Sequence, residues 1–393
     1  MKIAMLDPSG FGLLYDQQLC DALGRRGHEV RLFSRPLRDG ESSPSPAHTH
    51  IPIYYAVAER LRRRGSLRLA YEVIKGVEHF VCNSRVQAEL TEWAPDVIHF
   101  QWLILPIADR WLLAKLRRIA LLVLTVHDTT PHHGNPISRL QLWKWSDTMA
   151  QFDRLIVHTA FSKRQLGSAG IPIEQIEIIA HGVPELHRIG KEPYKAGHVA
   201  VDEWDQYLLF FGAIQPYKGV DVLIRAFALL PQHLQRKTRL LIAGKPYMSA
   251  SHLKELGDAL GVGQRITWDL RFIPDSEIHP LFERAEMVLF PYRNIDSSGA
   301  LMIALQHGKP VIGTRVGGFA DIIEDGVHGY LIPPEDPSSL AQAIQRLLEK
   351  PKLARALGAN ALHLAQALPT WDQIARQTEQ VYHKLTAEGS NRT

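Results

Sequence analysis

Cysteine is scarce in this chain, which has two among its 393 residues. Cys20 and Cys82 are too few for a disulfide framework, and each lies within an apolar, helix-like stretch. We therefore expect two buried thiols in a reducing compartment, which indicates a cytoplasmic protein. Histidines and cysteines also lack the spacing of a zinc site, so the sequence predicts no bound metal.

Long hydrophobic runs are absent as well. The longest, residues 119–126, has the length of a strand and falls short of the roughly 18 apolar residues that span a bilayer. The first six residues contain a lysine and are followed by Asp7, so they predict a strand rather than a secretory signal. The sequence therefore predicts neither a membrane span nor a leader peptide.

Neither sign of charge dominates, since the formal net charge is +4. Residues 1–190 hold 23 lysines and arginines against 19 aspartates and glutamates, whereas the other 203 residues hold 22 of each. Two runs in the first half combine basic and apolar residues, and their basic members are Arg60, Arg62, Arg63, Arg64 and Arg68, then Arg110, Lys115, Arg117 and Arg118. These runs predict either solvated helix faces or docking to anionic lipid headgroups or a phosphorylated acceptor. Duplex nucleic acid is disfavoured, because the charge is modest and no nucleic-acid module is present.

The length of the chain exceeds one typical core and predicts two domains. Strand-sized apolar runs alternate with longer amphipathic runs, which is typical of parallel sheets covered by helices. In the first half we expect strands at 2–6, 29–33, 97–100, 121–126, 154–158 and 176–179, and helices at 13–26, 68–93, 107–119, 138–152 and 162–169. The Ser/Pro/His-rich residues 38–53 predict a loop, and the polar residues 184–201 predict the junction between the domains.

One stretch in the second half carries a specific chemical signal. An apolar strand at 287–290 leads into a polar loop, and Ser297, Ser298 and Gly299 then open a helix that ends near Gly308. Free backbone N–H groups and the helix dipole favour an anion at such a helix start, and glycine lets a ligand approach closely. The alternative is that a serine only caps the helix. The stretch therefore predicts a phosphate site or a plain N-cap.

Together with this stretch, several others resemble the retaining nucleotide-sugar glycosyltransferases of the GT-B fold, in particular glycosyltransferase family 4 of group 1 type. The further stretches are GHEVRLFS (27–34), PDVIHFQW (95–102), the strand, loop and helix at 208–230, the strand at 238–246 and the approach to the polar loop at 266–292. The resemblance implies an α/β protein with two doubly wound, Rossmann-like domains facing a central cleft. It implies an acceptor-side domain at 1–190, a donor-binding domain at 200–369, and a helix in 370–393 that crosses back to the first domain.

The resemblance also assigns residues in the first domain. Gly10 and Gly12 match a glycine-rich loop that the family places beside the donor phosphates and the acceptor. His127 and Asp128 end the most apolar strand, and a histidine at this place contacts the transferred sugar in the family. A structural histidine is the alternative for His127. The departing phosphate oxygen, rather than a side chain, is implied to accept the acceptor proton.

In the second domain the charge candidate is Lys218, in a loop between a strand and a helix. A lysine there suits a donor phosphate, whereas the alternative is a surface lysine at a turn. The donor-binding residues that the resemblance implies besides Lys218 are Gly212, Gln215, Gly244, Arg271, Asp296, Ser297, Ser298, Gly299 and Ala300. No metal ligand and no cofactor is implied, because the nucleotide-sugar is a substrate and no Asp-x-Asp motif is present.

The chain departs from the family pattern in two places. An arginine is common soon after the strand glycine, where this chain has Ala213 to Gln215, and Arg271, Arg293 and Arg315 are left open as replacements. A Glu-x7-Glu pair is common where this chain has Ile295 and Ile303. The resemblance implies transfer from a UDP- or GDP-sugar to a saccharide, lipid-linked or small-molecule hydroxyl, as in polysaccharide or glycoconjugate biosynthesis. The departures keep open a catalytically weak, nucleotide-binding pseudo-enzyme or scaffold.

Overall fold

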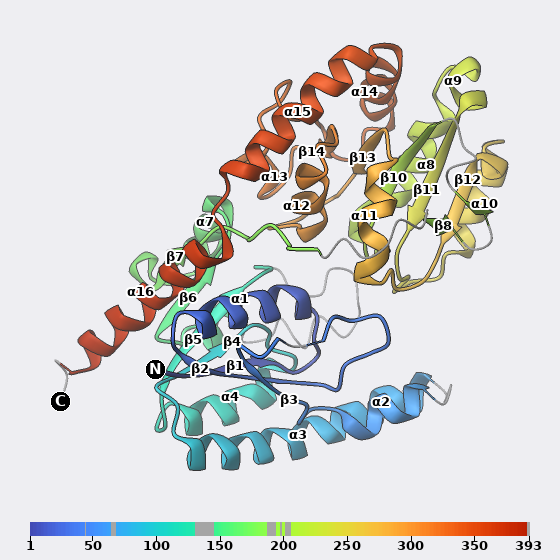
Figure 1. Cartoon of the computed structure of the whole chain (residues 1–393). Helices are drawn as coiled ribbons and strands as arrows, with labels where there is room; N and C mark the ends of the chain where they lie inside the picture. The colour runs from blue at the N-terminus through green and yellow to red at the C-terminus, as the bar shows by residue number, and fades with distance from the viewer. Residues whose placement is uncertain are drawn as a thin grey trace. The chain divides into compact units, whose positions relative to one another are not determined.

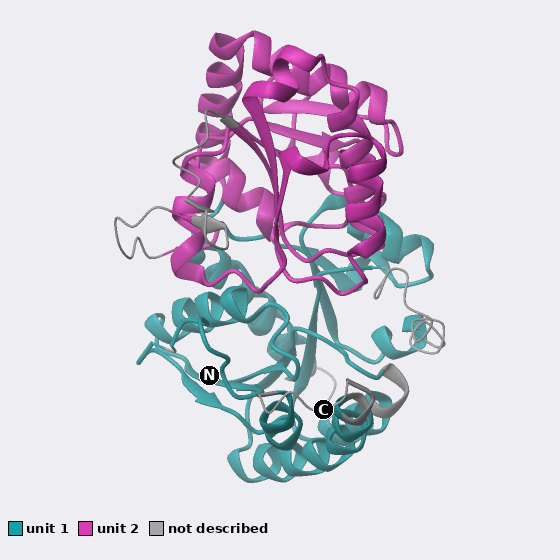
Figure 2. Cartoon of the chain, turned by 90° about the vertical axis from the view of Figure 1, so that its right-hand side faces the viewer, with its two compact units in different colours: residues 1–182, 369–393 teal, residues 183–368 magenta. Residues whose placement is uncertain are grey.

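The computed structural model describes residues 1–43, 45–63, 68–129, 145–186, 194–196, 199–200 and 206–390. They form two compact units, Met1–Gly182 with Pro369–Thr393, and Val183–Leu368 (Figure 2). The chain thus leaves the first unit after Gly182 and returns to it at Pro369. No helix among the described residues is both long and apolar enough to cross a bilayer.

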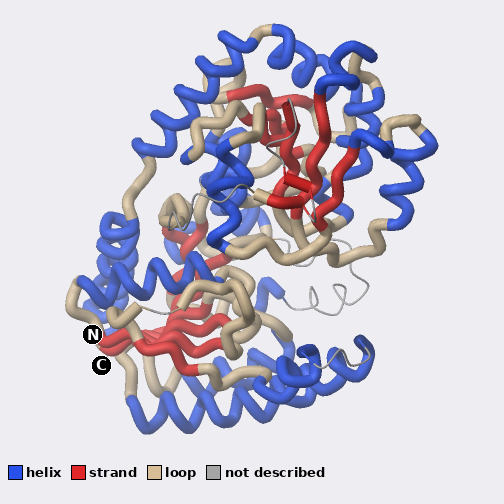
Figure 3. Tube along the Cα trace, turned by 45° about the vertical axis from the view of Figure 1, so that its right-hand side comes forward, coloured by secondary structure: helices blue, strands red, loops and turns tan. Residues whose placement is uncertain are grey.

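The first unit is built on a seven-stranded sheet whose order is β3-β2-β1-β4-β5-β6-β7, with every neighbouring pair parallel (Figure 3). Its strands are β1 (Lys2–Asp7), β2 (Glu29–Ser34), β3 (Thr49–Ile51), β4 (Val97–Phe100), β5 (Leu121–Val126), β6 (Arg154–Val157) and β7 (Ile176–Ile178). Its helices are α1 (Leu13–Arg25), α2 (Ala56–Arg63), α3 (Arg68–Trp93), α4 (Pro106–Leu116), α6 (Trp145–Met149), α7 (Ala160–Ser168) and α16 (Trp371–Ser390), with a 3₁₀ turn at Ile173–Gln175 (Figure 1).

Alternation along β1 shows how this sheet is covered on both faces. Ile3 and Met5 pack into the core formed with α1 and α16, whereas Ala4 and Leu6 pack into the core formed with α2, α3 and α4. Side chains of a strand point to opposite faces in turn, so an apolar residue at every position is what a sheet between two helical layers requires.

The terminal helix α16 is held to the first unit by polar and apolar contacts. Glu388 accepts from Arg154 at 2.7 Å, and Glu379 accepts from Arg26 at 2.6 Å. Trp371 is buried, and its ring would lie 2.6 Å from a Cβ placed on Gly182. The close approach of this ring therefore requires glycine at 182. It also places the residue at which the chain leaves the first unit next to the segment by which the chain returns to it.

One expectation about secondary structure needs correction, and another is tested only in part. The stretch expected to be a loop contains the edge strand β3, which pairs with β2 from Arg31–Thr49 to Phe33–Ile51. The helix expected at 138–152 is described only as the five-residue α6, since residues 138–144 lie outside the described residues.

The second unit repeats the plan with a six-stranded parallel sheet in the order β12-β11-β10-β13-β14-β15. Its strands are β10 (Gln206–Phe211), β11 (Thr238–Ala243), β12 (Ile266–Asp269), β13 (Met287–Phe290), β14 (Val311–Thr314) and β15 (Gly329–Ile332), and a separate antiparallel pair is β8 (Lys195–Ala196) with β9 (Val199–Ala200). Its helices are α8 (Val220–Ala228), α9 (Gln232–Lys237), α10 (Ser251–Ala259), α11 (Asp275–Glu283), α12 (Gly299–Gln306), α13 (Phe319–Ile322), α14 (Pro337–Glu349) and α15 (Pro351–Ala367), with 3₁₀ turns at Pro216–Lys218 and Gly263–Arg265.

Both sheets are doubly wound, which confirms the predicted α/β class. The strand order reverses between β1 and β4 in the first unit and between β10 and β13 in the second. In open α/β sheets, ligands bind beyond the carboxyl ends of the strands at such a switch point. The loops after these four strands are therefore where ligand-binding residues are expected in each unit.

Candidate active-site residues in the two units

Lys218 lies at the switch point of the second unit, and its side chain is buried. It ends the 3₁₀ turn Pro216–Lys218 that follows β10 and is 8% exposed. Its ammonium donates to the hydroxyl of Tyr292 at 3.1 Å and lies 4.5 Å from the centre of that ring. Burial raises the pKa of Tyr292 above its usual range, so the phenol stays neutral. The lysine is therefore an interior charge and not a solvated surface group.

Glycine at 219 fits the turn between Lys218 and α8 for a steric reason. Gly219 has a φ of +66°, and a Cβ there would stand 1.9 Å from the carbonyl oxygen of Pro291. The loop after β10 and the loop after β13 thus touch through their backbones, which only glycine permits at this position. This contact fixes the distance between Lys218 and the polar loop that leads to α12.

Gly212 and Gly244 directly follow β10 and β11, and their backbones lie close together. A Cβ on Gly244 would stand 1.9 Å from the carbonyl oxygen of Gly212, so backbone packing accounts for Gly244. A Cβ on Gly212 would lie 3.4 Å from the Lys218 ammonium, so Gly212 leaves room beside that charge. Gln215 begins the turn that carries Lys218, because its carbonyl accepts the backbone N–H of Lys218 at 3.0 Å.

The start of α12 is the second component of this switch point. Ser298 is the N-cap, and its hydroxyl accepts the backbone N–H of Leu301 at 3.3 Å. Asp296 is buried, whereas Ser297, Gly299 and Ala300 are partly exposed. The N-cap expected of one serine is therefore present at Ser298, and the first turn of α12 begins at Gly299 next to the loop after β13.

The neighbouring strand end holds this polar loop in place. Gly317, in the loop after β14, has a φ of +53°, and a Cβ there would stand 1.6 Å from the carbonyl oxygen of Ile295. The same carbonyl accepts the backbone N–H of Gly318 at 3.1 Å. The loop is thus shaped by main-chain contacts from both sides, through Gly219 and through Gly317.

Ile295 and Ile303 occupy the two positions where a glutamate pair is common. Both are nearly buried, at 8% and 5% exposure, and both belong to the apolar core of the second unit. A carboxylate at either place would be desolvated without a partner in an apolar core, which is costly. The two isoleucines are therefore integrated in the packing, and a ligand in this unit meets no carboxylate from these positions.

The three arginines left open by the sequence all carry carboxylate partners. Arg293 forms a bidentate pair with Asp221 at 3.0 and 2.8 Å and also donates to the carbonyl of Pro216. Arg271 pairs with Asp269 at 3.0 Å and with Glu277. Arg315 pairs with Asp325 at 2.6 Å. Arg293 thus supports the turn that carries Lys218, whereas Arg271 follows β12, which is two strands away from β10.

The first unit has a rigid turn after β1. The carboxylate of Asp7 accepts three backbone N–H groups, from Ser9 at 3.2 Å, Gly10 at 2.9 Å and Gly12 at 3.2 Å. Gly10 has a φ of +59°, where glycine is favoured. A Cβ on Gly12 would lie 3.4 Å from the indole nitrogen of Trp102, in the loop after β4. The two loops of this switch point therefore approach each other at Gly12.

His127 follows β5 and is joined to His158, which follows the neighbouring strand β6. The Nδ1 atom of His127 lies 3.1 Å from Nε2 of His158, and Nδ1 of His158 lies 2.9 Å from the carbonyl oxygen of Ile179. A carbonyl only accepts, so neutral His158 donates from Nδ1 and accepts at Nε2 from His127. The other nitrogen of His127, Nε2, lies 3.0 Å from the side-chain oxygen of Gln101, which also only accepts, so a neutral His127 donates to one of these two acceptors at a time.

Aromatic rings enclose this pair. Trp102 stacks on His127 with ring centres 5.1 Å apart, and the edge of Tyr15 meets both histidines. Burial lowers the pKa of His127 well below its usual range and that of His158 to about 3, and neighbouring histidines add to the effect. Both rings are therefore neutral at pH 7 and act as hydrogen-bonding groups. Asp128 follows at a partly exposed position.

His158 and Tyr15 are the residues that sequence reasoning missed here. His158 ends a predicted strand just as His127 does, and Val126 and Val157 are partners in neighbouring parallel strands. A histidine after each of two adjacent strands is a signal that the sequence contained. Tyr15 carried no such signal, because its place in α1 fitted an ordinary buried face.

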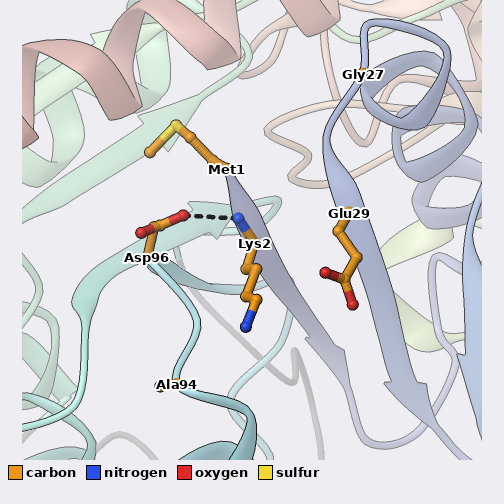
Figure 4. Close-up of a pocket in the computed structure, with 6 residues that line it drawn as sticks. All are labelled: Met1, Lys2, Gly27, Glu29, Ala94 and Asp96. Atoms are coloured by element: carbon orange, nitrogen blue, oxygen red, sulfur yellow. Dashed lines mark hydrogen bonds between the residues drawn. The ribbon is translucent and has the colours of Figure 1, made fainter.

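A pocket of about 470 Å³ lies elsewhere in the first unit (Figure 4). Its lining residues are Met1, Lys2, Gly27, Glu29, Ala94 and Asp96, and the carboxylate of Asp96 accepts the backbone N–H of Lys2 at 2.7 Å. These residues surround the amino ends of β1 and β2, whereas the switch-point loops follow the carboxyl ends of the strands. We therefore do not assign substrate binding to this pocket.

Comparison with known families accounts for most of the chain in two segments. Residues 17–185 match the family described as "Glycosyltransferase Family 4", and residues 196–363 match the family described as "Glycosyl transferases group 1". A curated relative is the D-inositol 3-phosphate glycosyltransferase of Nocardioides sp., which is 29% identical over 295 residues. That alignment covers 71% of this chain and 64% of the relative, so somewhat less than two thirds of the relative is matched.

Two solved structures share the fold over nearly the whole chain. Sucrose-phosphate synthase from Thermosynechococcus elongatus has a TM-score of 0.75 and 22% identity, covering 99% of this chain and 100% of that one. Anabaena HepE in complex with UDP and glucose has a TM-score of 0.72 and 19% identity, covering 98% and 100%. The two parallel-sheet units and the two matching segments agree with this two-domain GT-B fold. The chain belongs to the group 1 glycosyltransferases of family 4.

Proposed function

We propose that this glycosyltransferase transfers a sugar from a nucleotide-diphospho-sugar of UDP or GDP type to an acceptor hydroxyl, with retention of anomeric configuration. One observation carries the proposal: the buried ammonium of Lys218 and the start of α12 lie at the same switch point, joined by the Gly219–Pro291 contact. A cation and free backbone N–H groups at one place suit the two phosphates of such a donor.

The proposed roles in the second unit follow from charge. Breaking the bond from the sugar to the diphosphate leaves negative charge on the β-phosphate, and a fixed cation stabilises that charge more than it stabilises the intact donor. Lys218 is the proposed cation, while Gly299 and Ala300 offer N–H groups and Gly212 leaves room. Asp296, Ser297 and Gln215 are proposed to line the nucleotide side. HepE has been solved with UDP and with UDP-glucose, which supports a uridine donor as the first probe.

The proposed roles in the first unit concern the sugar and the acceptor. His127, held by His158, is proposed to donate or accept a hydrogen bond at the transferred sugar, with Asp128 beside it. Gly10 and Gly12 are proposed to let the acceptor or the donor phosphates approach the backbone. The leaving phosphate oxygen would take the acceptor proton as the new glycosidic bond forms, so the step balances without a side-chain base.

A thermal-shift screen with UDP, GDP, ADP and TDP tests the nucleotide first. We expect one diphosphate to raise the melting temperature, since a ligand that binds only the folded state stabilises it. Arg271 is included as a proposed donor contact, and Arg271→Ala should then reduce the shift. No shift with any of the four would contradict the donor assignment.

Turnover and stereochemistry come next. UDP-glucose and the matching GDP-sugar should be hydrolysed slowly alone and faster with an acceptor, and D-inositol 3-phosphate is a first acceptor because the curated relative is named for it. NMR of the first product formed should show the anomeric configuration of the donor. Activity that persists in EDTA would agree with a reaction that needs no metal.

One alternative has a specific observation in its favour. Ile295 and Ile303 present no carboxylate to a ligand, which favours a catalytically weak, nucleotide-binding protein. Binding of nucleotide without hydrolysis or transfer, over a panel of sugar donors and acceptors, would support this scaffold and reject the enzyme.

A further inference from the structure

The outward face of α3 in the first unit shows no exposed charged side chain among the described residues from Val73 to Ser84. Exposed residues recur at a spacing of three or four, which places them on one face of the helix. They are Val73, Val77, Phe80, Val81, Ser84, Ala88 and Thr91, and the exposed Arg85 and Glu92 lie beside them in the second half of the helix. Water-exposed helix faces are normally charged or polar, so the apolar first half of this face, on a helix of 26 residues, needs an explanation.

The first half of this face is strongly apolar. Val73, Val77, Phe80 and Val81, which we call the α3 stripe, are exposed by 59%, 63%, 58% and 47%. Four large apolar residues on adjacent turns form a contiguous patch, and contiguous patches mark contact surfaces where scattered ones do not. Figure 1 shows α2 and α3 as the outer layer of their unit, away from the sheet's other helical layer of α1 and α16.

The charge of the chain is concentrated around this stripe. Residues 54–120, which contain α2, α3 and α4, hold 11 lysines and arginines against 7 aspartates and glutamates. This difference of +4 equals the net charge of the whole chain, so the rest of the chain is balanced. Two of the seven acids, Glu59 and Asp109, are 4% exposed, and Glu59 pairs with both Arg38 and Arg62 while Asp109 pairs with His79.

The basic residues of this segment lie on the helices that flank α3. Arg60 and Arg62 on α2 are exposed, and so are Arg117 and Arg118 after α4. Arg64 lies outside the described residues, and the side chains of Arg63 and Arg68 are not described. On α4, Trp111 is 55% exposed with the Lys115 ammonium 3.4 Å from its ring centre. Tryptophan and basic residues beside an apolar stripe are typical of helices that lie in a membrane interface.

We propose that the α3 stripe inserts into an anionic membrane surface, with the basic residues of α2 and α4 on the lipid headgroups. The position of α3 gives this docking a use. Lys75 on α3 donates to the hydroxyl of Ser9 at 3.2 Å, in the turn between β1 and Gly12. The segment of α3 that carries the start of the stripe therefore contacts this turn with its opposite face. The docking rests on the surface alone, whereas the consequence that the acceptor is lipid-linked rests on the proposed function.

Sedimentation of the full chain with vesicles tests the docking. Vesicles of phosphatidylcholine with about one quarter phosphatidylglycerol should pellet the protein at low salt, and high salt should weaken binding because it screens exposed charges. Phe80→Glu should lower the apparent affinity about tenfold or more, since a carboxylate opposes insertion among acyl chains. Leu229→Glu is the matched control, because Leu229 is 59% exposed but lies in the second unit.

Three outcomes would overturn the proposal. They are no binding to anionic vesicles at low salt, equal loss of binding in Phe80→Glu and Leu229→Glu, and a dimer in sedimentation velocity that Phe80→Glu dissociates without any vesicle binding. The last would assign the stripe to a second copy of this chain. Turnover with a soluble acceptor should be unchanged in Phe80→Glu, so a failed docking test is distinguishable from a failed donor assignment.

Discussion

His127 and His158 are joined ring to ring, with Nδ1 of one 3.1 Å from Nε2 of the other. The pair links the ends of two neighbouring strands, β5 and β6, and the carbonyl of Ile179 sets which nitrogen of His158 carries its proton. Protonating His158 would break this order, because its Nε2 atom accepts from His127. Burial holds both imidazoles neutral, and the direction of the hydrogen bonds adds to this effect for His158.

This pair predicts that the protein loses stability in mild acid. Burial lowers the pKa of His158 to about 3, below the value of about 6.5 for an unfolded histidine. The unfolded state thus binds the proton first, so the free energy of unfolding falls as the pH drops below 6.5 towards 3. Between pH 7 and pH 5 the loss is about 2 kcal/mol for each such histidine. Urea denaturation of the wild type at these two pH values measures it.

The matched variants are His158→Gln and the exposed His363→Gln. His158→Gln should lose less stability between pH 7 and pH 5 than the wild type, by about 2 kcal/mol, because one group no longer titrates. His363→Gln should behave as the wild type does. An identical pH dependence in all three proteins would contradict a neutral, buried His158.

Lys218→Ala should lower turnover of the sugar donor by roughly 10- to 100-fold, because a charge-assisted bond to the leaving phosphate is worth about 1.5–3 kcal/mol. Tyr292→Phe is the control, since it removes the hydroxyl that Lys218 contacts but keeps the charge. Initial rates with the donor found by thermal shift, with circular dichroism to check folding, measure the effect. Equal rates for Lys218→Ala and the wild type would remove the lysine from the donor site.

Gly299→Val should abolish the thermal stabilisation by nucleotide while the unliganded melting temperature stays within a few degrees. The valine would place a branched side chain at the first residue of α12, where the phosphate is proposed to meet free N–H groups. Gly76→Val is the control, because a Cβ at Gly76 meets nothing within 4 Å. A normal nucleotide shift in Gly299→Val would leave Ser298 as a plain N-cap.

Trp371→Ala should lower the free energy of unfolding by about 3–5 kcal/mol, the usual cost of removing a large buried ring. Trp371 is 3% exposed and packs on Tyr15 and Gly182. Trp111→Ala removes the same side chain from a surface, since Trp111 is 55% exposed, and should change stability by about 0.5 kcal/mol or less. Urea denaturation of both variants measures the free energy of unfolding. A loss in Trp371→Ala as small as the loss in Trp111→Ala would show that Trp371 contributes little to the stability of the first unit.

The sequence predicted the fold well where a strand is fixed by its own pattern. Apolar residues on both faces identify β1, and its neighbour β4, together with β5 beyond it, was placed at the observed residues. The edge strand β3 was missed because Thr49–Ile51 has a polar, loop-like composition and becomes a strand only by pairing with β2. Such pairing is a tertiary effect that local propensity does not contain.

For the candidate sites, the sequence predicted which residues follow a strand, but it did not predict which side chains pair with one another. Lys218 and Ser298 were singled out because each follows a strand, and strand order later put both loops at one switch point. The pair of Arg293 with Asp221 joins residues 72 apart and depends on how two loops pack. Their roles in donor binding stay predictions.

The contact between Gly182 and Trp371 has a practical consequence for dissecting the protein. Residues 183–368 are an insertion between two pieces of the first unit, so they can be expressed as one uninterrupted fragment. The first unit cannot, but its two cut ends lie next to each other, because Trp371 covers Gly182. Joining Gly182 to Pro369 through a short glycine-serine linker should therefore yield a closed, single-chain version of that unit, in which its vesicle binding can be measured without the other half.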